Sequence, residues 1–101
     1  MLNRVDLQAR LEELLGSPNV YFQPPESMQI KYDAIVYSRK SIENRHANDS
    51  VYKQDDAYEV VAIYRNPDSD LPRKISRLPK CRFDRHYTSD NLNHDAFTLY
   101  W

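Results

Sequence analysis

The chain contains very little glycine and cysteine. Its 101 residues include one glycine, Gly16, and one cysteine, Cys81. Loops that cradle phosphates or dinucleotides need several glycines at fixed spacing, because the backbone must approach the phosphate closely. The sequence therefore excludes P-loop and Rossmann chemistry. A lone cysteine cannot close an intrachain disulfide, so nothing indicates a disulfide-stapled secreted scaffold.

Long apolar runs are also lacking. No stretch approaches the roughly 20 apolar residues of a membrane-spanning helix, and the first residues lack the apolar core of a signal peptide. We therefore expect a protein made in a reducing cytoplasm and not bound to a membrane. Hydrophobic residues make up 41% and charged residues 29% of the chain. These values are typical of a folded domain, and we expect a single domain over residues 1–101.

Two segments have the apolar spacing of helices. The first is predicted over residues 4–15, with Asn3 as N-cap, Gly16 as the left-handed residue after its end, and a stripe of Leu7, Leu11, Leu14 and Leu15. The second is short and begins after a cap at Ser69 or Asp70. It has Pro72 in its first turn and an apolar stripe of Leu71, Ile75 and Leu78.

Five segments are rich in β-branched and aromatic residues and predict strands: residues 20–23, 30–37, 58–64, 81–87 and 92–101. The third of these is apolar on both alternating faces, which favours a central strand covered on both sides. Residues 88–91 are turn formers and predict a four-residue connection between the last two strands.

Residues 38–56 carry charges and turn formers without a sustained period. This pattern predicts a long exposed loop between the second and third strands, with a hairpin tip as the alternative. Structureless connections above about 12 to 15 residues are uncommon in compact domains and are often functional. The resulting fold class is α+β, with an N-terminal and a short internal helix packed on a largely antiparallel sheet of four to five strands.

Possible catalytic or metal-binding residues lie near the C-terminal end: Cys81, Asp84, His86, His94 and Asp95. Their spacing lacks the close ligand pairs of structural zinc sites. Cys81 with His86 or His94 could form a nucleophile and base, but Cys81 begins an apolar strand face that favours packing. We therefore expect no enzyme activity, no metal and no cofactor.

Charge is unevenly distributed along the chain. Residues 71–101 hold six basic and three acidic residues, a net charge of +3, whereas residues 1–70 hold eight and twelve, a net charge of −4. A basic patch could follow phosphate, but the overall pI of about 6.3 is low for a dedicated nucleic-acid binder. Copies joined head-to-tail, basic surface to acidic surface, would use both halves and could close into a ring.

Four phrases in the chain resemble a family of small proteins encoded among the head-and-tail genes of long-tailed bacteriophages. They are GSPNVYFQPP (16–25), YDAIVY (32–37), YRNPDSDLP (64–72) and FDRHYTSDNLNHD (83–95). The order helix, three strands, helix, hairpin is similar to that of tail-terminator and tail-completion proteins. The resemblance implies a homomeric ring, typically hexameric, that caps the tail tube and presents it to the head connector or stopper protein.

That resemblance also implies where the contacts and the protein itself would lie. The virion neck would be its location after assembly in the bacterial cytoplasm, and DNA would pass through the ring without sequence readout. The expected contacts are the 39–56 segment, facing a neighbour or the tube, and the basic face of the second helix. The residues concerned are Arg39, Lys40, Arg45, Tyr52, Lys53, Asp55, Asp56, Arg73, Lys74 and Arg77.

Two alternatives remain beside the tail-terminator role. One is another component of the head-tail connector. The other is a small DNA-binding accessory domain that uses the basic residues of the 73–85 segment.

Overall fold

A computed structural model describes residues 3–47 and 50–101. Within these ranges it describes every side chain except those of residues 43, 45–47 and 50–55. The elements in chain order are α1 (Arg4–Leu15), β1 (Val20–Phe22), β2 (Ala34–Ala47), β3 (Ser50–Tyr64), α2 (Leu71–Ser76), β4 (Cys81–Ser89) and β5 (Leu92–Tyr100). The five strands form one sheet in the order β1-β2-β3-β5-β4. Only β1 and β2 pair in parallel, so the expected α+β class with a largely antiparallel sheet is confirmed.

Helix α1 begins and ends as its sequence predicts. Asn3 and Asp6 form a capping box, in which the Asn3 side chain accepts from the Asp6 backbone and the Asp6 side chain accepts from the Asn3 backbone. Gly16 follows the helix with a φ of 74°, a left-handed conformation that costs glycine little. Neither described helix is long and apolar enough to cross a membrane.

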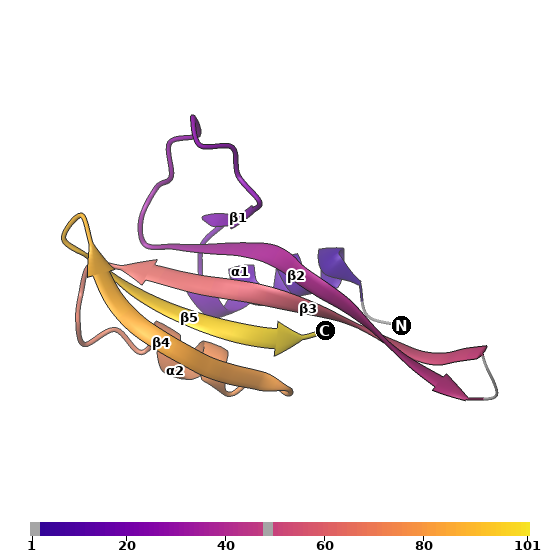
Figure 1. Ribbon diagram of the computed structural model, residues 1–101. Helices are drawn as coiled ribbons and strands as arrows, with labels where there is room; N and C mark the ends of the chain where they lie inside the picture. The colour runs from indigo at the N-terminus through magenta and orange to yellow at the C-terminus, as the bar shows by residue number, and fades with distance from the viewer. Residues whose placement is uncertain (1–2, 48–49) are drawn as a thin grey trace.

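Both helices pack on the same face of the sheet (Figure 1). Leu7 and Leu11 of α1 and Leu71 and Ile75 of α2 are buried there. The sheet contributes Tyr37, Tyr58, Val60, Phe97 and Leu99, which are all at most 1% exposed. We call this the helix-covered face and the opposite side the open face.

Strand β3 occupies the middle of the sheet, as its apolar sequence predicted. Its residues alternate between the two faces: Val60 points to the helices, and Ile63 lies on the open face. Both are buried, Val60 at 0% and Ile63 at 7% exposure. Central placement between β2 and β5 explains why this strand is apolar on both faces.

Three predicted boundaries are wrong. The expected loop over residues 38–56 is, where described, the continuation of β2 and β3 as a hairpin, with residues 48–49 outside the described chain. The strand expected from Ile30 begins at Ala34. The connection between β4 and β5 is the two-residue turn Asp90-Asn91, whose positive φ values of 54° and 64° match the type of turn that suits a tight hairpin.

Candidate partner interface

The distal part of the β2–β3 hairpin projects beyond the rest of the sheet (Figure 1). Strand β3 pairs with β5 only from Ala57 onward, whereas β2 and β3 remain paired out to Ala47 and Ser50. Residues 41–47 and 50–56 therefore form a two-stranded arm, and the other described residues form the body. The long dimension of the molecule is 51 Å against 27 and 22 Å for the other two.

Two β-bulges lie near the base of the arm. One places an extra residue, Lys40, between Arg39 and Ser41 of β2, and the other places Asp84 between Phe83 and Arg85 of β4. A bulge leaves one residue without a cross-strand partner and re-aims its side chain.

The two bulge residues meet at one hydroxyl group on the open face. Thr98 of β5 donates to Asp84 Oδ2 at 2.6 Å, and Lys40 Nζ lies 3.4 Å from Thr98 Oγ1. Arg82 Nε contacts the other Asp84 oxygen at 3.1 Å. This bulge network ties β2, β5 and β4 together at the point where the arm leaves the sheet.

The bulge network favours the charged form of its carboxylate. The hydrogen bond from Thr98 is the largest cause that lowers the pKa of Asp84 below its usual value, and Arg82 and Lys40 lower it further. The charged carboxylate contacts Thr98 and Arg82 directly, while Lys40 contacts the Thr98 hydroxyl.

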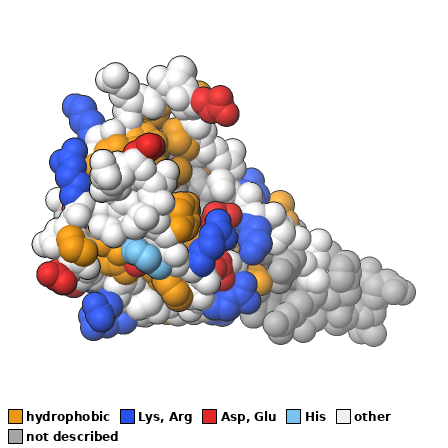
Figure 2. Space-filling model, turned by 60° about the vertical axis from the view of Figure 1, so that its left-hand side comes forward, with side chains coloured by type: hydrophobic (Ala, Val, Ile, Leu, Met, Phe, Trp, Pro, Cys, Tyr) orange, Lys and Arg blue, Asp and Glu red, His pale blue; other side chains and the backbone are white. Residues whose placement is uncertain are grey.

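The helix-covered face of the arm base holds a second set of polar contacts. The Arg39 guanidinium lies 3.4 Å from the Asp56 carboxylate and 3.4 Å from the Tyr58 hydroxyl. The backbone of Trp101 also donates to the Asp56 carbonyl at 3.0 Å. Figure 2 shows basic and acidic side chains gathered on the body beside the arm.

The basic residues of the 73–85 segment do not form one surface. Arg82 and Arg85 lie opposite Thr98 and Ala96 in register and so belong to the open face. Arg73 and Lys74 lie on α2, which packs on the helix-covered face. Because the sheet separates the two groups, the phosphates of one bound nucleic acid strand would contact only one of them.

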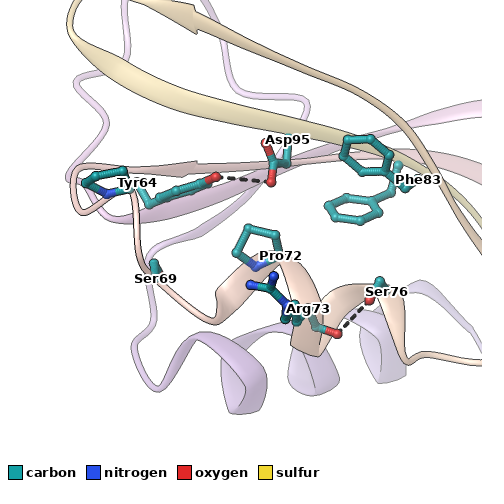
Figure 3. Close-up of a pocket in the computed structure, with 9 residues that line it drawn as sticks. Tyr64, Ser69, Pro72, Arg73, Ser76, Phe83 and Asp95 are labelled. Atoms are coloured by element: carbon teal, nitrogen blue, oxygen red, sulfur yellow. Dashed lines mark hydrogen bonds between the residues drawn. The ribbon is translucent and has the colours of Figure 1, made fainter.

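A cavity of about 350 Å³ lies between α2 and the strands β4 and β5 (Figure 3). Its wall includes Arg73, Ser76 and Phe83, and its floor includes Tyr64 and Asp95. The Ser76 hydroxyl donates to the Arg73 carbonyl at 2.7 Å, so it is already used within the helix. Of the expected contact residues on α2, Arg73 therefore faces this cavity, while Lys74 lies 3.7 Å from Asp70.

A buried hydrogen-bond network lies at the bottom of this cavity. Tyr64 donates to Asp95 Oδ2 at 3.1 Å, and the other Asp95 oxygen contacts His86 Nδ1. Burial, assisted by the hydrogen bond to Asp95, raises the pKa of Tyr64 to about 12. The Tyr64 phenol thus stays protonated and acts as a donor that stabilises the 6%-exposed aspartate.

The candidate catalytic residues are distributed over both faces of the sheet. Cys81, His86 and Asp95 lie on the helix-covered side, whereas Asp84 and His94 lie on the open side. Within the described residues, no three His, Cys, Asp or Glu side chains are grouped so that they could hold a metal ion. Burial raises the pKa of the Cys81 thiol to about 11, which disfavours the thiolate that a nucleophile needs.

The structure places only some of the expected interface residues. Arg39, Lys40 and Asp56 lie at the arm base, and Arg73 and Lys74 lie on α2, with Arg77 directly after it. The side chains of Arg45, Tyr52, Lys53 and Asp55 lie outside the described part of the arm. Sequence reasoning missed Thr98 and Asp84 as members of the arm base, because their proximity to Lys40 depends on strand register.

The sequence matches no protein-family model and no curated protein.

Proposed function

We propose that this protein is a structural component of a phage virion. In this proposal it forms a homomeric ring at the head-proximal end of the tail, terminates the tail tube and joins it to the head connector. DNA passes through the ring without base readout. The four sequence phrases support this role by resemblance, and the observed element order corresponds to the order that the resemblance implies.

The arm is the observation that carries the proposal. An isolated two-stranded hairpin is marginally stable in water, because it has no third strand and no buried face. The described arm segments, residues 41–47 and 50–56, form such a hairpin. Their strands pair with no third strand, and a backbone bond from Trp101 to the Asp56 carbonyl ties only the base to the body. A neighbouring subunit or the tail tube would supply the missing face, which explains why the chain maintains an arm that its own core does not support.

The β4 edge of the sheet is poorly suited to assembly by strand addition. Edge strand β4 carries a bulge at Asp84 and the charged side chains of Arg82 and Arg85. Bulges and charges on an edge strand hinder pairing with another sheet. We therefore place the contact between copies at the projecting arm and not at the β4 edge.

Native mass spectrometry on the full chain and on an arm-shortened variant tests this proposal. Replacing residues 42–56 with Asn-Gly closes Ser41 and Ala57, which pair in the native sheet, with a tight turn. We expect the wild-type chain to form a ring, alone or on purified tail tubes, and the variant to stay monomeric with an intact body by circular dichroism. A variant that assembles as well as the wild type would contradict the role of the arm.

Electron micrographs of virions made without the protein test the role in the particle. We expect tails that are abnormal in length or not joined to heads. Normal-length tails joined to heads in the absence of the protein would overturn the proposal.

A DNA-binding domain, the competing function, predicts a different result. Monomeric protein would bind DNA with a steep salt dependence, and replacing the basic residues of the 73–85 segment would largely abolish that binding. These residues are Arg73, Lys74, Arg77, Lys80, Arg82 and Arg85. The division of the basic residues between the two faces of the sheet favours the ring.

A further inference from the structure

Five large hydrophobic side chains are substantially exposed in the described part of the chain: Val5, Met28, Ile42, Phe83 and Tyr87. Ile42 differs from the others because it lies on the arm, where it is 52% exposed and pairs with Asp56. By sequence, residues 41–56 contain four acidic and two basic residues, a net charge of −2. The arm therefore combines an exposed aliphatic side chain, Ile42, with an excess of negative charge in its sequence.

A second cavity lies on the body at the end of the sheet from which the arm projects. It has a volume of about 380 Å³ and is lined by Arg10, Leu78, Pro79, Lys80, Tyr100 and Trp101. We call it the Trp101 pocket. Leu78, Pro79 and the indole provide apolar lining, and Lys80 provides positive charge, whereas the Arg10 guanidinium already contacts the Glu13 carboxylate at 3.0 Å.

The contents of the pocket and of the arm are complementary. An aliphatic side chain suits the apolar lining, and a segment of net charge −2 suits the positive charge of Lys80. Ile42 does not line the pocket of its own chain and stays half exposed there. The Ile42 side chain is thus available for a contact outside its own chain.

We propose that the Trp101 pocket receives Ile42 from the arm of a second copy of this chain. This inference rests on the proposed ring and identifies where on the neighbour the arm docks. The contact is heterologous, arm to pocket, so each copy gives one arm and accepts one, as closure of a ring requires.

Tryptophan fluorescence reports directly on this docking, because Trp101 is the only tryptophan in the chain. Raising the protein concentration through assembly should shift Trp101 emission to shorter wavelength as the indole loses contact with water. Ile42→Lys should remove the shift and weaken association at least about tenfold. Met28→Lys, which changes a similarly exposed side chain in the 23–33 segment, should change neither.

The positive charge of Lys80 in the Trp101 pocket provides a second pair of variants. Lys80→Glu places a like charge against the acidic arm and should weaken association about tenfold. Lys31→Glu makes the same change of charge away from the pocket and should leave association unchanged. Equal effects of these two substitutions would overturn the charge complementarity on which the docking depends.

Cross-linking between differently tagged copies identifies the contact itself. In a Cys81→Ser background, one copy carries Ile42→Cys and the other carries Pro79→Cys. Oxidation of the mixture should give a disulfide heterodimer at least about tenfold faster than a mixture of Met28→Cys and Pro79→Cys copies. Equal rates in the two mixtures would overturn the docking of Ile42 beside Pro79.

The outcomes separate this inference from the ring on which it rests. Assembly into rings with unchanged Trp101 emission and no preferred cross-link overturns the docking site and leaves the ring standing. A chain that stays monomeric at every concentration, with tail tubes included, overturns both. Assembly with a shifted emission and the expected heterodimer supports both.

Discussion

The body and the arm share the strands β2 and β3 but are stabilised in different ways. In the body these strands lie between β1 and β5 and bury Tyr37 and Val60 under two helices. In the arm they pair only with each other, and the side chain of Ile42 is half exposed. The same hairpin is therefore part of the core at one end, and at the other end it projects from the body without a third strand.

The point where the two regions meet shows how the body holds the arm. The bulge residues Lys40 and Asp84 both reach Thr98 on the open face, and Arg39 holds Asp56 on the helix-covered face. Polar contacts on both faces fix the direction of the arm without covering its length. The body thus presents an arm of defined direction to another molecule.

Truncating the body core should have the largest effect on stability. Phe97 is fully buried, and Phe97→Ala should lower the free energy of unfolding by about 3–5 kcal/mol through lost burial and a cavity. Ile42→Ala in the arm should change it by less than about 0.5 kcal/mol. Urea denaturation of both variants measures the contrast, and similar losses would show that arm and body are stabilised alike.

High pH should weaken the body through Tyr64. Because the folded-state pKa of Tyr64 is raised from 10.0 to about 12, its contribution is complete below pH 10 and is lost as the pH rises toward 12. The loss amounts to about 2–3 kcal/mol. Unfolding free energies between pH 9 and 12 should fall more steeply for the wild type than for Tyr64→Phe, and equal slopes would contradict this account.

Breaking the bulge network should have an intermediate effect. Thr98→Val keeps the shape of the side chain but removes the hydroxyl between Lys40 and Asp84, and should cost about 1–2 kcal/mol at neutral pH. Thr88→Val, at an exposed position of β4, should cost less than about 0.5 kcal/mol.

The same variant should also change the response to acid. Because the pKa of Asp84 is lowered in the folded state, its contribution is present above the usual carboxyl pKa and is lost as the pH falls through the folded value. Thr98→Val should reduce this loss, as measured by urea denaturation between pH 2 and pH 6. An undiminished acid response would show that Thr98 does not hold the carboxylate.

The ion pair at the arm base should have the smallest effect. The Arg39 and Asp56 side chains are 43% and 29% exposed, and exposed pairs contribute only about 0.2–1 kcal/mol. Arg39→Gln should therefore cost less than about 1 kcal/mol, and the cost should shrink in 1 M salt because of screening. A larger loss that is independent of salt would indicate that Arg39 acts through packing over the Tyr58 ring, 5.8 Å away.

Local signals in the sequence were sufficient to predict the main elements of the body. The capping box of Asn3 and Asp6, the left-handed Gly16 and the leucine spacing define α1 within a few neighbouring residues. The apolar run at 58–64 identifies a central strand because both of its faces are buried. Each of these features depends on residues close together in the chain, which explains why the fold class could be predicted.

The arm and its base could not be found in the same way. Residues 41–56 show no alternation of apolar and polar side chains from which strands could be predicted. The meeting of Lys40, Asp84 and Thr98 depends on two bulges and on pairing between distant strands. A contact between residues so far apart in the chain cannot be predicted from the pattern of neighbouring residues.

Hydrogen exchange on the isolated chain and on the assembled ring tests the central claim most directly. We predict that backbone amides in the described arm segments, residues 41–47 and 50–56, become more strongly protected on assembly. The amides of residues 57–64, already paired on both sides within the body, should change little. Arm amides that are equally protected in the isolated chain and in the ring would contradict the claim that the arm obtains its missing face from a partner.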